Sequence, residues 1–120
     1  ERKSKEDAMG TILGWGDRRE RFKATLEFLA SIKVAAVVIE CTFGDLVNSA
    51  ESRGVKSIAE NRLILHRQVL AWATDYRVPF IFSDDRRFAE ANAFRIMARC
   101  YSRQITNQKK SEKKVSVENA

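Results

Sequence analysis

The sequence predicts an α/β domain in which helices cover a small, buried sheet. Two short runs rich in β-branched and aromatic residues, at 33–41 and 78–83, alternate with longer segments of helical periodicity. The first run is continuously apolar over 34–39, which is typical of a strand buried on both faces of a parallel or mixed sheet. Two strands are too few for a stable sheet. We therefore expect a fragment or a processed product whose N-terminal strands precede Glu1.

Two helices are expected before the first strand. Ser4 is a suitable N-cap for a short helix over 4–13, and the "GWG" stretch at 14–16 favours a turn. Asp17 and Glu20 form a start similar to a capping box for a second helix over 17–32. Its apolar residues fall at helical spacing: Phe22, Leu26, Leu29 and Ile32.

After the first strand, residues 42–54 are expected to form a connection with one helical turn. Ser57 and Glu60 then predict a capping box for a long helix over 57–76. The second strand follows at 78–83, with Pro79 near its start.

A closing helix is expected over 84–105, capped by Asp84 or Asp85. The next residues are polar, charged and aperiodic, which is typical of a disordered tail or a linker. The sequence thus divides into a domain at 1–106 and a disordered charged tail at 107–120.

Composition narrows the class of protein. The 120 residues suit one domain, and 44% hydrophobic with 32% charged residues argues against a disordered chain. No apolar run approaches the roughly 20 residues of a membrane span. Cys41 and Cys100 are too few for a disulfide framework or a zinc knuckle, so we expect a reducing, cytoplasmic setting, or the nucleus in a eukaryote. A net charge of +6 favours nucleic acid over membrane as a partner, but it equally suits a small protein that needs solubility.

The first seven residues, "ERKSKED", carry the candidate chemistry. If "ERK" ends a strand, Glu1 and Lys3 point to one side and Arg2 to the other. A carboxylate can hold Mg²⁺ or Mn²⁺, and a nearby lysine can orient the attacking water or offset negative charge in phosphodiester hydrolysis. Asp7, one turn into the next helix, could be a further ligand or could orient one. The alternative for such a charged triplet is a solvated, partly frayed terminus.

The longer pattern resembles a known family. The spacing E-R-K-x-x-x-D, followed by "RRERF" and by "VVIE" at the end of a buried run, resembles the XPF-type structure-specific nucleases in their compact bacterial and phage form. The similarity covers roughly residues 1–105. It implies a restriction-endonuclease-like layered fold, with a central mixed sheet flanked by helices and with its N-terminal strands missing from this chain.

The resemblance also implies roles for particular residues. Glu1 would be a metal ligand, Lys3 the catalytic lysine and Asp7 the last acid of the motif. Arg2 would contact phosphate or brace the fold, and Glu40 would serve either bracing or chemistry. The family carries a Gly-Asp pair before E-R-K that this chain lacks, so we expect these 120 residues alone to be weakly active or inactive.

A basic cluster opens the second expected helix, formed by Arg18, Arg19, Arg21 and Lys23. Cations are unfavourable at a helix N-terminus, which favours a role in DNA phosphate contact. The alternative is a solvated helix face with charge pairs to residues such as Glu20.

The expected function is that of a Mg²⁺- or Mn²⁺-dependent DNA endonuclease in repair, recombination or mobile-element processing. Its substrate would be DNA, branched or flapped by analogy with the family. The alternative is a catalytically inactive nuclease-like scaffold that binds DNA or a partner protein. A homodimer is expected through the last two helices, around Trp72, Phe88 and Phe94.

Overall fold

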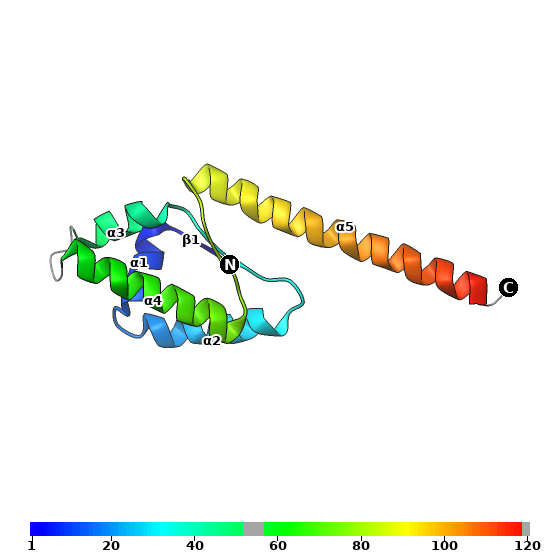
Figure 1. Ribbon diagram of the computed structural model, residues 1–120, viewed down its shortest axis with the longest axis horizontal. Helices are drawn as coiled ribbons and strands as arrows, with labels where there is room; N and C mark the ends of the chain where they lie inside the picture. Colours follow the sequence, from blue (N-terminus) through cyan, green and yellow to red (C-terminus); the bar gives the residue numbers. More distant parts are fainter. Residues whose placement is uncertain (52–56, 119–120) are drawn as a thin grey trace.

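The computed structural model describes residues 1–51 and 57–118. Helices make up most of this part of the chain, and three very short strands form one sheet (Figure 1). The elements in chain order are β1 (Arg2–Lys3), α1 (Lys5–Leu13), α2 (Arg18–Ser31), β2 (Val37–Ile39), α3 (Phe43–Glu51), α4 (Ile58–Tyr76), β3 (Phe80–Phe82) and α5 (Arg86–Glu118).

The sheet is parallel throughout, with the strand order β1-β2-β3. Two helices connect β1 to β2 and two connect β2 to β3, as parallel neighbours require crossover connections. The expected fold class is therefore wrong: the protein is mostly helical with a small parallel sheet, and it is not a layered restriction-endonuclease-like fold around a central mixed sheet. Only three residues of each apolar run pair in β2 and β3, because the rest of each run leads into or out of the sheet.

Only one helical turn was expected where α3 forms, because Gly44, Asn48 and Ser49 resemble the composition of a loop. A local cap and burial outweigh that composition. The Thr42 hydroxyl accepts a hydrogen bond from the Asp45 N–H, which satisfies one free donor at the helix start. Leu46 and Val47 are completely buried, so the helix is stabilised by packing. Residues 52–54 of the expected connection lie outside the described residues.

Helix α5 continues well past the expected end at 105 and extends away from the rest of the molecule (Figure 1). Residues 107–118, which the sequence indicates as a disordered tail, are helical in the structure; residues 119–120 lie outside the described residues. No glycine or proline interrupts 86–118, and its many lysine, glutamine, glutamate and arginine residues are good helix formers. This helix accounts for the long dimension of the molecule, which measures 70 × 27 × 20 Å.

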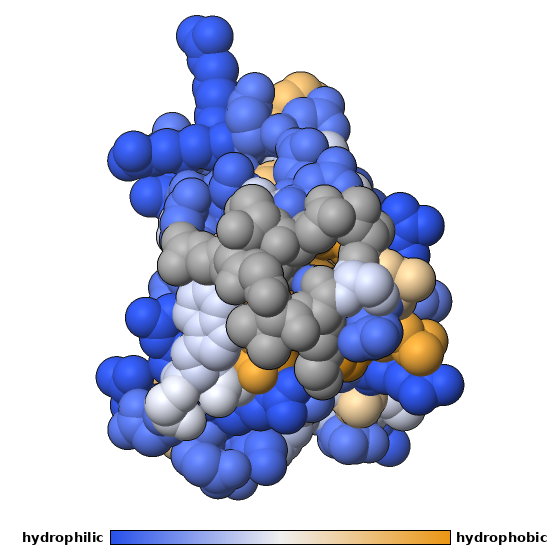
Figure 2. Space-filling model, turned by 90° about the vertical axis from the view of Figure 1, so that its left-hand side faces the viewer, coloured by the Kyte–Doolittle hydropathy of each residue, from blue (hydrophilic) through white to orange (hydrophobic). Residues whose placement is uncertain are grey.

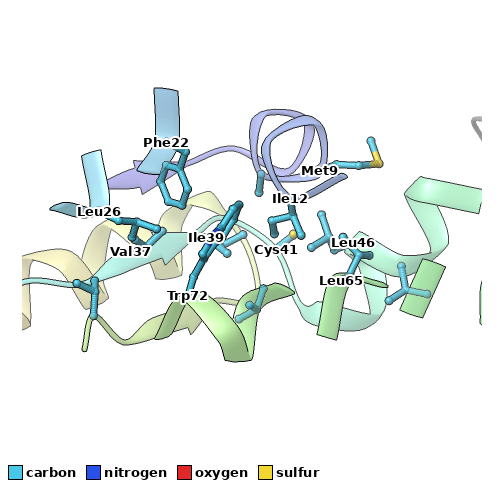
Figure 3. Packing of buried hydrophobic residues seen from close by; sticks show 14 of the residues in the cluster. Met9, Ile12, Phe22, Leu26, Val37, Ile39, Cys41, Leu46, Leu65 and Trp72 are labelled. Carbon is cyan, nitrogen blue, oxygen red and sulfur yellow. The ribbon is translucent and has the colours of Figure 1, made fainter. Parts of the chain in front are cut away.

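The main core lies on one face of the sheet, between β2 and the helices α1, α2 and α4 (Figure 3). Val37 and Ile39 are completely buried there. Phe22 of α2 meets Trp72 of α4 edge to face, with ring centroids 5.2 Å apart, which is a favourable aromatic geometry. Trp72, expected at a dimer surface, therefore belongs to the core, as its label in Figure 3 shows.

The opposite face of the sheet is covered by the beginning of α5. Side chains alternate along a strand, so Val38 points away from the main core. Val38 and Ala89 of α5 are both buried. The register pairs Arg2 with Val38 and Lys3 with Ile39, so the two residues of β1 belong to different faces of the sheet.

The outer surface at the end where α3 and α4 lie is mostly hydrophilic, with isolated hydrophobic residues (Figure 2). Within residues 1–51 and 57–118, no helix combines the length and the apolar character that a membrane crossing requires.

Candidate active site

Strand β1 and the start of α1 bring Glu1, Lys3 and Asp7 together. The Lys3 Nζ lies 3.4 Å from Oδ2 of Asp7 and 3.9 Å from Oε1 of Glu1. Strand alternation accounts for the Lys3–Glu1 pair and the (i, i+4) spacing for the Lys3–Asp7 pair. The prediction that Glu1 and Lys3 share a side is thus confirmed by their contact.

Backbone hydrogen bonds fix this arrangement. The carbonyl of Glu1 accepts from the Val38 N–H at 2.8 Å, and the carbonyl of Lys3 accepts from the Glu40 N–H at 2.9 Å. Helix α1 begins directly afterwards, where the Ser4 hydroxyl accepts from the Asp7 N–H at 3.2 Å. This cap places Asp7 in the first turn, on the side of Lys3.

The Lys3 side chain is only 10% exposed, which is unusual for a lysine. Its ammonium lies 4.8 Å from the centroid of the Phe22 ring, within the range of a cation–π contact. A buried charge requires partners, and the Glu1 and Asp7 carboxylates supply them. The ammonium is therefore held in one place by two acids and one aromatic ring.

An open pocket of about 310 Å³ lies beside this group. Its wall is mainly polar and is formed by residues of β1, α1 and α2: Lys3, Asp7, Thr11, Arg18, Arg21, Phe22 and Thr25. Thr11 and Thr25 were not predicted as site residues. Their positions one helical turn beyond Asp7 and Arg21 are the signal that could have found them.

The basic cluster of α2 divides into separate roles. Arg18 and Arg21 line the pocket, although Arg21 also pairs with Asp17 at 3.1 Å. The guanidinium of Arg19 instead donates two hydrogen bonds to the carbonyl of Ile12, at 3.0 and 2.6 Å, and so caps the end of α1. Lys23 pairs with Glu20 at 3.4 Å. The structure thus brings two of these four residues to the pocket.

Arg2 lies on the other face of the sheet, as alternation predicts. Its Nε lies 3.1 Å from Oε1 of Glu40, and its Nη1 lies 3.2 Å from Oε1 of Glu90 in α5. Arg2 and Glu40 therefore brace α5 against the sheet. Neither residue lines the pocket around Lys3.

The donor set for a metal ion is small. Among residues 1–51 and 57–118, no three or more histidine, cysteine, aspartate or glutamate side chains gather as metal ligands. Glu1 and Asp7 are two carboxylates close to one point, the Lys3 ammonium. Mg²⁺ is often held by one or two carboxylates, with water and phosphate oxygens completing its shell. These residues fit such a minimal site.

Other residues with reactive side chains have structural surroundings. Trp15 packs against the core, and the His66 ring lies edge to face with Phe43, with centroids 6.2 Å apart. Cys41 is buried, and burial, with a smaller effect of the Asp45 charge, raises the pKa of its thiol to about 11. A thiol that stays protonated is a poor nucleophile.

Comparison with protein-family models, with curated proteins and with solved structures found no match to this chain. The inference of function therefore depends on the geometry around Lys3 and on the motif that supplies its residues.

Proposed function

We propose that this protein is a Mg²⁺- or Mn²⁺-dependent endonuclease that hydrolyses DNA phosphodiester bonds in repair, recombination or mobile-element processing. The observation that carries the proposal is the convergence of Glu1 and Asp7 on the buried ammonium of Lys3. These are the three residues through which the sequence resembles the XPF-type nucleases.

Each residue of the group has a part that its position supports. Glu1 and Asp7 would hold the metal ion, which when bound polarises the phosphate and lowers the pKa of a coordinated water. Lys3 would donate a hydrogen bond to the attacking water or to a phosphate oxygen and offset negative charge as the reaction proceeds. The Phe22 ring beneath the ammonium restricts where that donor can lie.

The pocket supports phosphate binding next to Lys3. Arg18 and Arg21 line the same wall, and arginine presents a planar fork of donors that matches phosphate oxygens. Arg21 would leave Asp17 to bind a phosphate with little loss of free energy, because ion pairs between exposed side chains are weak.

The test is cleavage of end-labelled flapped and linear DNA duplexes by the chain, with Mn²⁺, with Mg²⁺ or with EDTA. We expect slow cleavage that requires the metal, and a loss of about 100-fold or more in Lys3→Met, the order of magnitude for removal of one group that stabilises a transition state. Lys5→Met is the matched control, because Lys5 is the next lysine along the chain and does not line the pocket.

Two outcomes would contradict the proposal. One is cleavage by Lys3→Met at the rate of the unchanged protein. The other is no cleavage of any of these substrates above that of Lys3→Met. Circular dichroism of both variants shows whether the helical fold is retained.

The second candidate is a nuclease-like scaffold without catalytic activity. It is favoured by the small donor set, since both nearby carboxylates already pair with Lys3 and the described residues hold no larger ligand group. Calorimetric titration with Mn²⁺ separates the two candidates. The endonuclease binds the ion and loses binding in Asp7→Asn, whereas the scaffold shows no heat of binding.

A further inference from the structure

The positive charge of the protein is concentrated in its last quarter. Residues 1–90 contain fifteen basic and fourteen acidic residues, whereas residues 91–120 contain seven basic and two acidic residues. The last thirty residues therefore contribute five of the six net positive charges. All seven of these basic residues lie on α5.

The seven basic residues share one side of α5. With 3.6 residues per turn, they fall within an arc of about 140°. We call this side the α5 basic face; it consists of Arg95, Arg99, Arg103, Lys109, Lys110, Lys113 and Lys114. Each of these side chains is exposed. Glu112, the acid nearest to the lysines, falls outside this arc.

The α5 basic face is exposed to solvent. In the part of the chain that the structure describes, no ion pair involves Arg95, Arg99 or Arg103. These arginines border an open pocket of about 370 Å³, whose other lining residues include Ile96 and Cys100. Like charges four residues apart slightly destabilise a helix, so the row is unfavourable for folding alone.

We propose that the α5 basic face binds the phosphate backbone of a nucleic acid duplex. Residues four apart on a helix are displaced by about 6 Å along its axis, which spreads the arginines into a regular row of positive charge. A duplex offers a regular row of phosphates, and arginine can bind them with paired donors. This inference goes beyond the proposed cleavage reaction, because it requires neither a metal ion nor hydrolysis.

A membrane surface suits this helix less well. Helices that lie on membranes need an apolar face along their length. Residues 106–114, which carry the four lysines, contain no apolar residue. The exposed apolar side chains Phe94, Met97 and Tyr101 are confined to an earlier part of α5 and point away from the basic face.

The experiment measures fluorescence anisotropy of a labelled 20-base-pair DNA duplex in EDTA, between 50 and 200 mM NaCl. The test variant is Arg95→Gln, Arg99→Gln, Arg103→Gln. The matched control is Lys33→Gln, Arg62→Gln, Arg67→Gln, which removes three exposed cations without an ion pair among the described residues. Glutamine is a good helix former, so α5 is expected to stay helical by circular dichroism.

We expect the test variant to bind at least ~10-fold more weakly at 100 mM NaCl, and its slope of log K against log salt to fall by about 2 to 3, since each phosphate contact contributes about 0.9. The slope of the control variant is expected to stay within about one unit of the slope of the unchanged protein. An RNA duplex bound with the same loss supports recognition of the backbone; an RNA duplex that alone shows the loss narrows the ligand to RNA.

Equal weakening in the test and control variants would overturn the proposal. Binding to phosphatidylserine vesicles that exceeds binding to the duplex would also overturn it, in favour of a membrane surface. Since EDTA prevents metal-dependent cleavage, a protein that cuts nothing still reports on this face. Failure of the proposed nuclease activity is therefore distinguishable from failure of this binding.

Discussion

Five basic residues near the motif and on α2 differ from those on α5 beyond Glu90. These five contact acids, a carbonyl or an aromatic ring: Arg2, Lys3, Arg19, Arg21 and Lys23. Beyond Glu90, the described part of α5 shows no ion pair. The same residue types therefore make internal contacts at these five positions and are available to a ligand along α5. A count of basic residues could not make this distinction, whereas contacts and burial do.

The largest difference between the regions concerns the core. Leu26 of α2 is completely buried, whereas Phe94 of α5 is 68% exposed. We expect Leu26→Ala to lower the free energy of unfolding by about 3 kcal/mol, through lost transfer energy and a cavity. Phe94→Ala should change it by less than about 0.5 kcal/mol. Urea unfolding followed by circular dichroism measures both, and a comparable loss in Phe94→Ala would show that α5 packs more firmly than described.

The two cysteines give a second contrast. Cys41 is buried in the body and Cys100 is partly exposed on α5, so iodoacetamide at pH 8 should modify Cys100 first. The pKa of Cys41 rises from 9.0 to about 11, which lowers its thiolate fraction about 100-fold relative to the unfolded chain. Mass spectrometry of native and urea-unfolded protein measures the two rates. Equal labelling of Cys41 in both states would contradict this burial.

The raised pKa of Cys41 also makes the stability of the protein depend on pH. A thiol whose pKa is higher in the folded state favours folding while it stays protonated. Its contribution is fully present below pH 9 and is lost as the pH rises towards 11.

The smallest expected effect concerns the link between the two regions. Arg2 joins β1 to Glu90 of α5, but the two side chains are 42% and 49% exposed, so solvent screens the pair. Arg2→Met should lower the free energy of unfolding by about 1 kcal/mol, with a coupling to Glu90→Gln of about 0.5 kcal/mol that shrinks in 0.5 M NaCl. Arg86→Met is the control, since Arg86 pairs with Glu90 from within α5. A larger effect of Arg86→Met would contradict a bracing role for Arg2.

Capping residues in the sequence correctly predicted where α1 and α4 begin. The Ser4 and Ser57 hydroxyls accept hydrogen bonds from Asp7 and Glu60, because a cap involves only neighbouring residues. The capping interpretation of Asp17 was wrong, since its side chain makes no cap hydrogen bond. The Asp17 carboxylate instead pairs with Arg21, one turn further along α2.

Features that depend on distant contacts were not predictable. The sequence could show that Val37 and Ile39 would be buried, but the number of strands and their parallel order depend on pairing between segments about 35 to 45 residues apart. The existence of α3 likewise depends on the burial of Leu46 and Val47 beneath other helices.

The candidate site shows the same division. Alternation along β1 and the spacing of α1 were enough to place Glu1, Lys3 and Asp7 together. The different roles of Arg18 and Arg19 could not be predicted from the sequence, because the role of Arg19 depends on how the C-terminal end of α1 packs against α2. Consecutive residues on a helix point in directions about 100° apart, so a cluster in sequence is divided in space.

The length of α5 sets a minimum footprint for whatever lies along it. From Arg95 to Lys114 the helix rises about 28 Å, which corresponds to about eight base pairs of B-form DNA. A shorter oligonucleotide could reach the arginines or the lysines but not both groups at once. Affinity should therefore grow with duplex length up to that size. Beyond it, affinity should rise only slowly, because a longer duplex offers more overlapping binding positions.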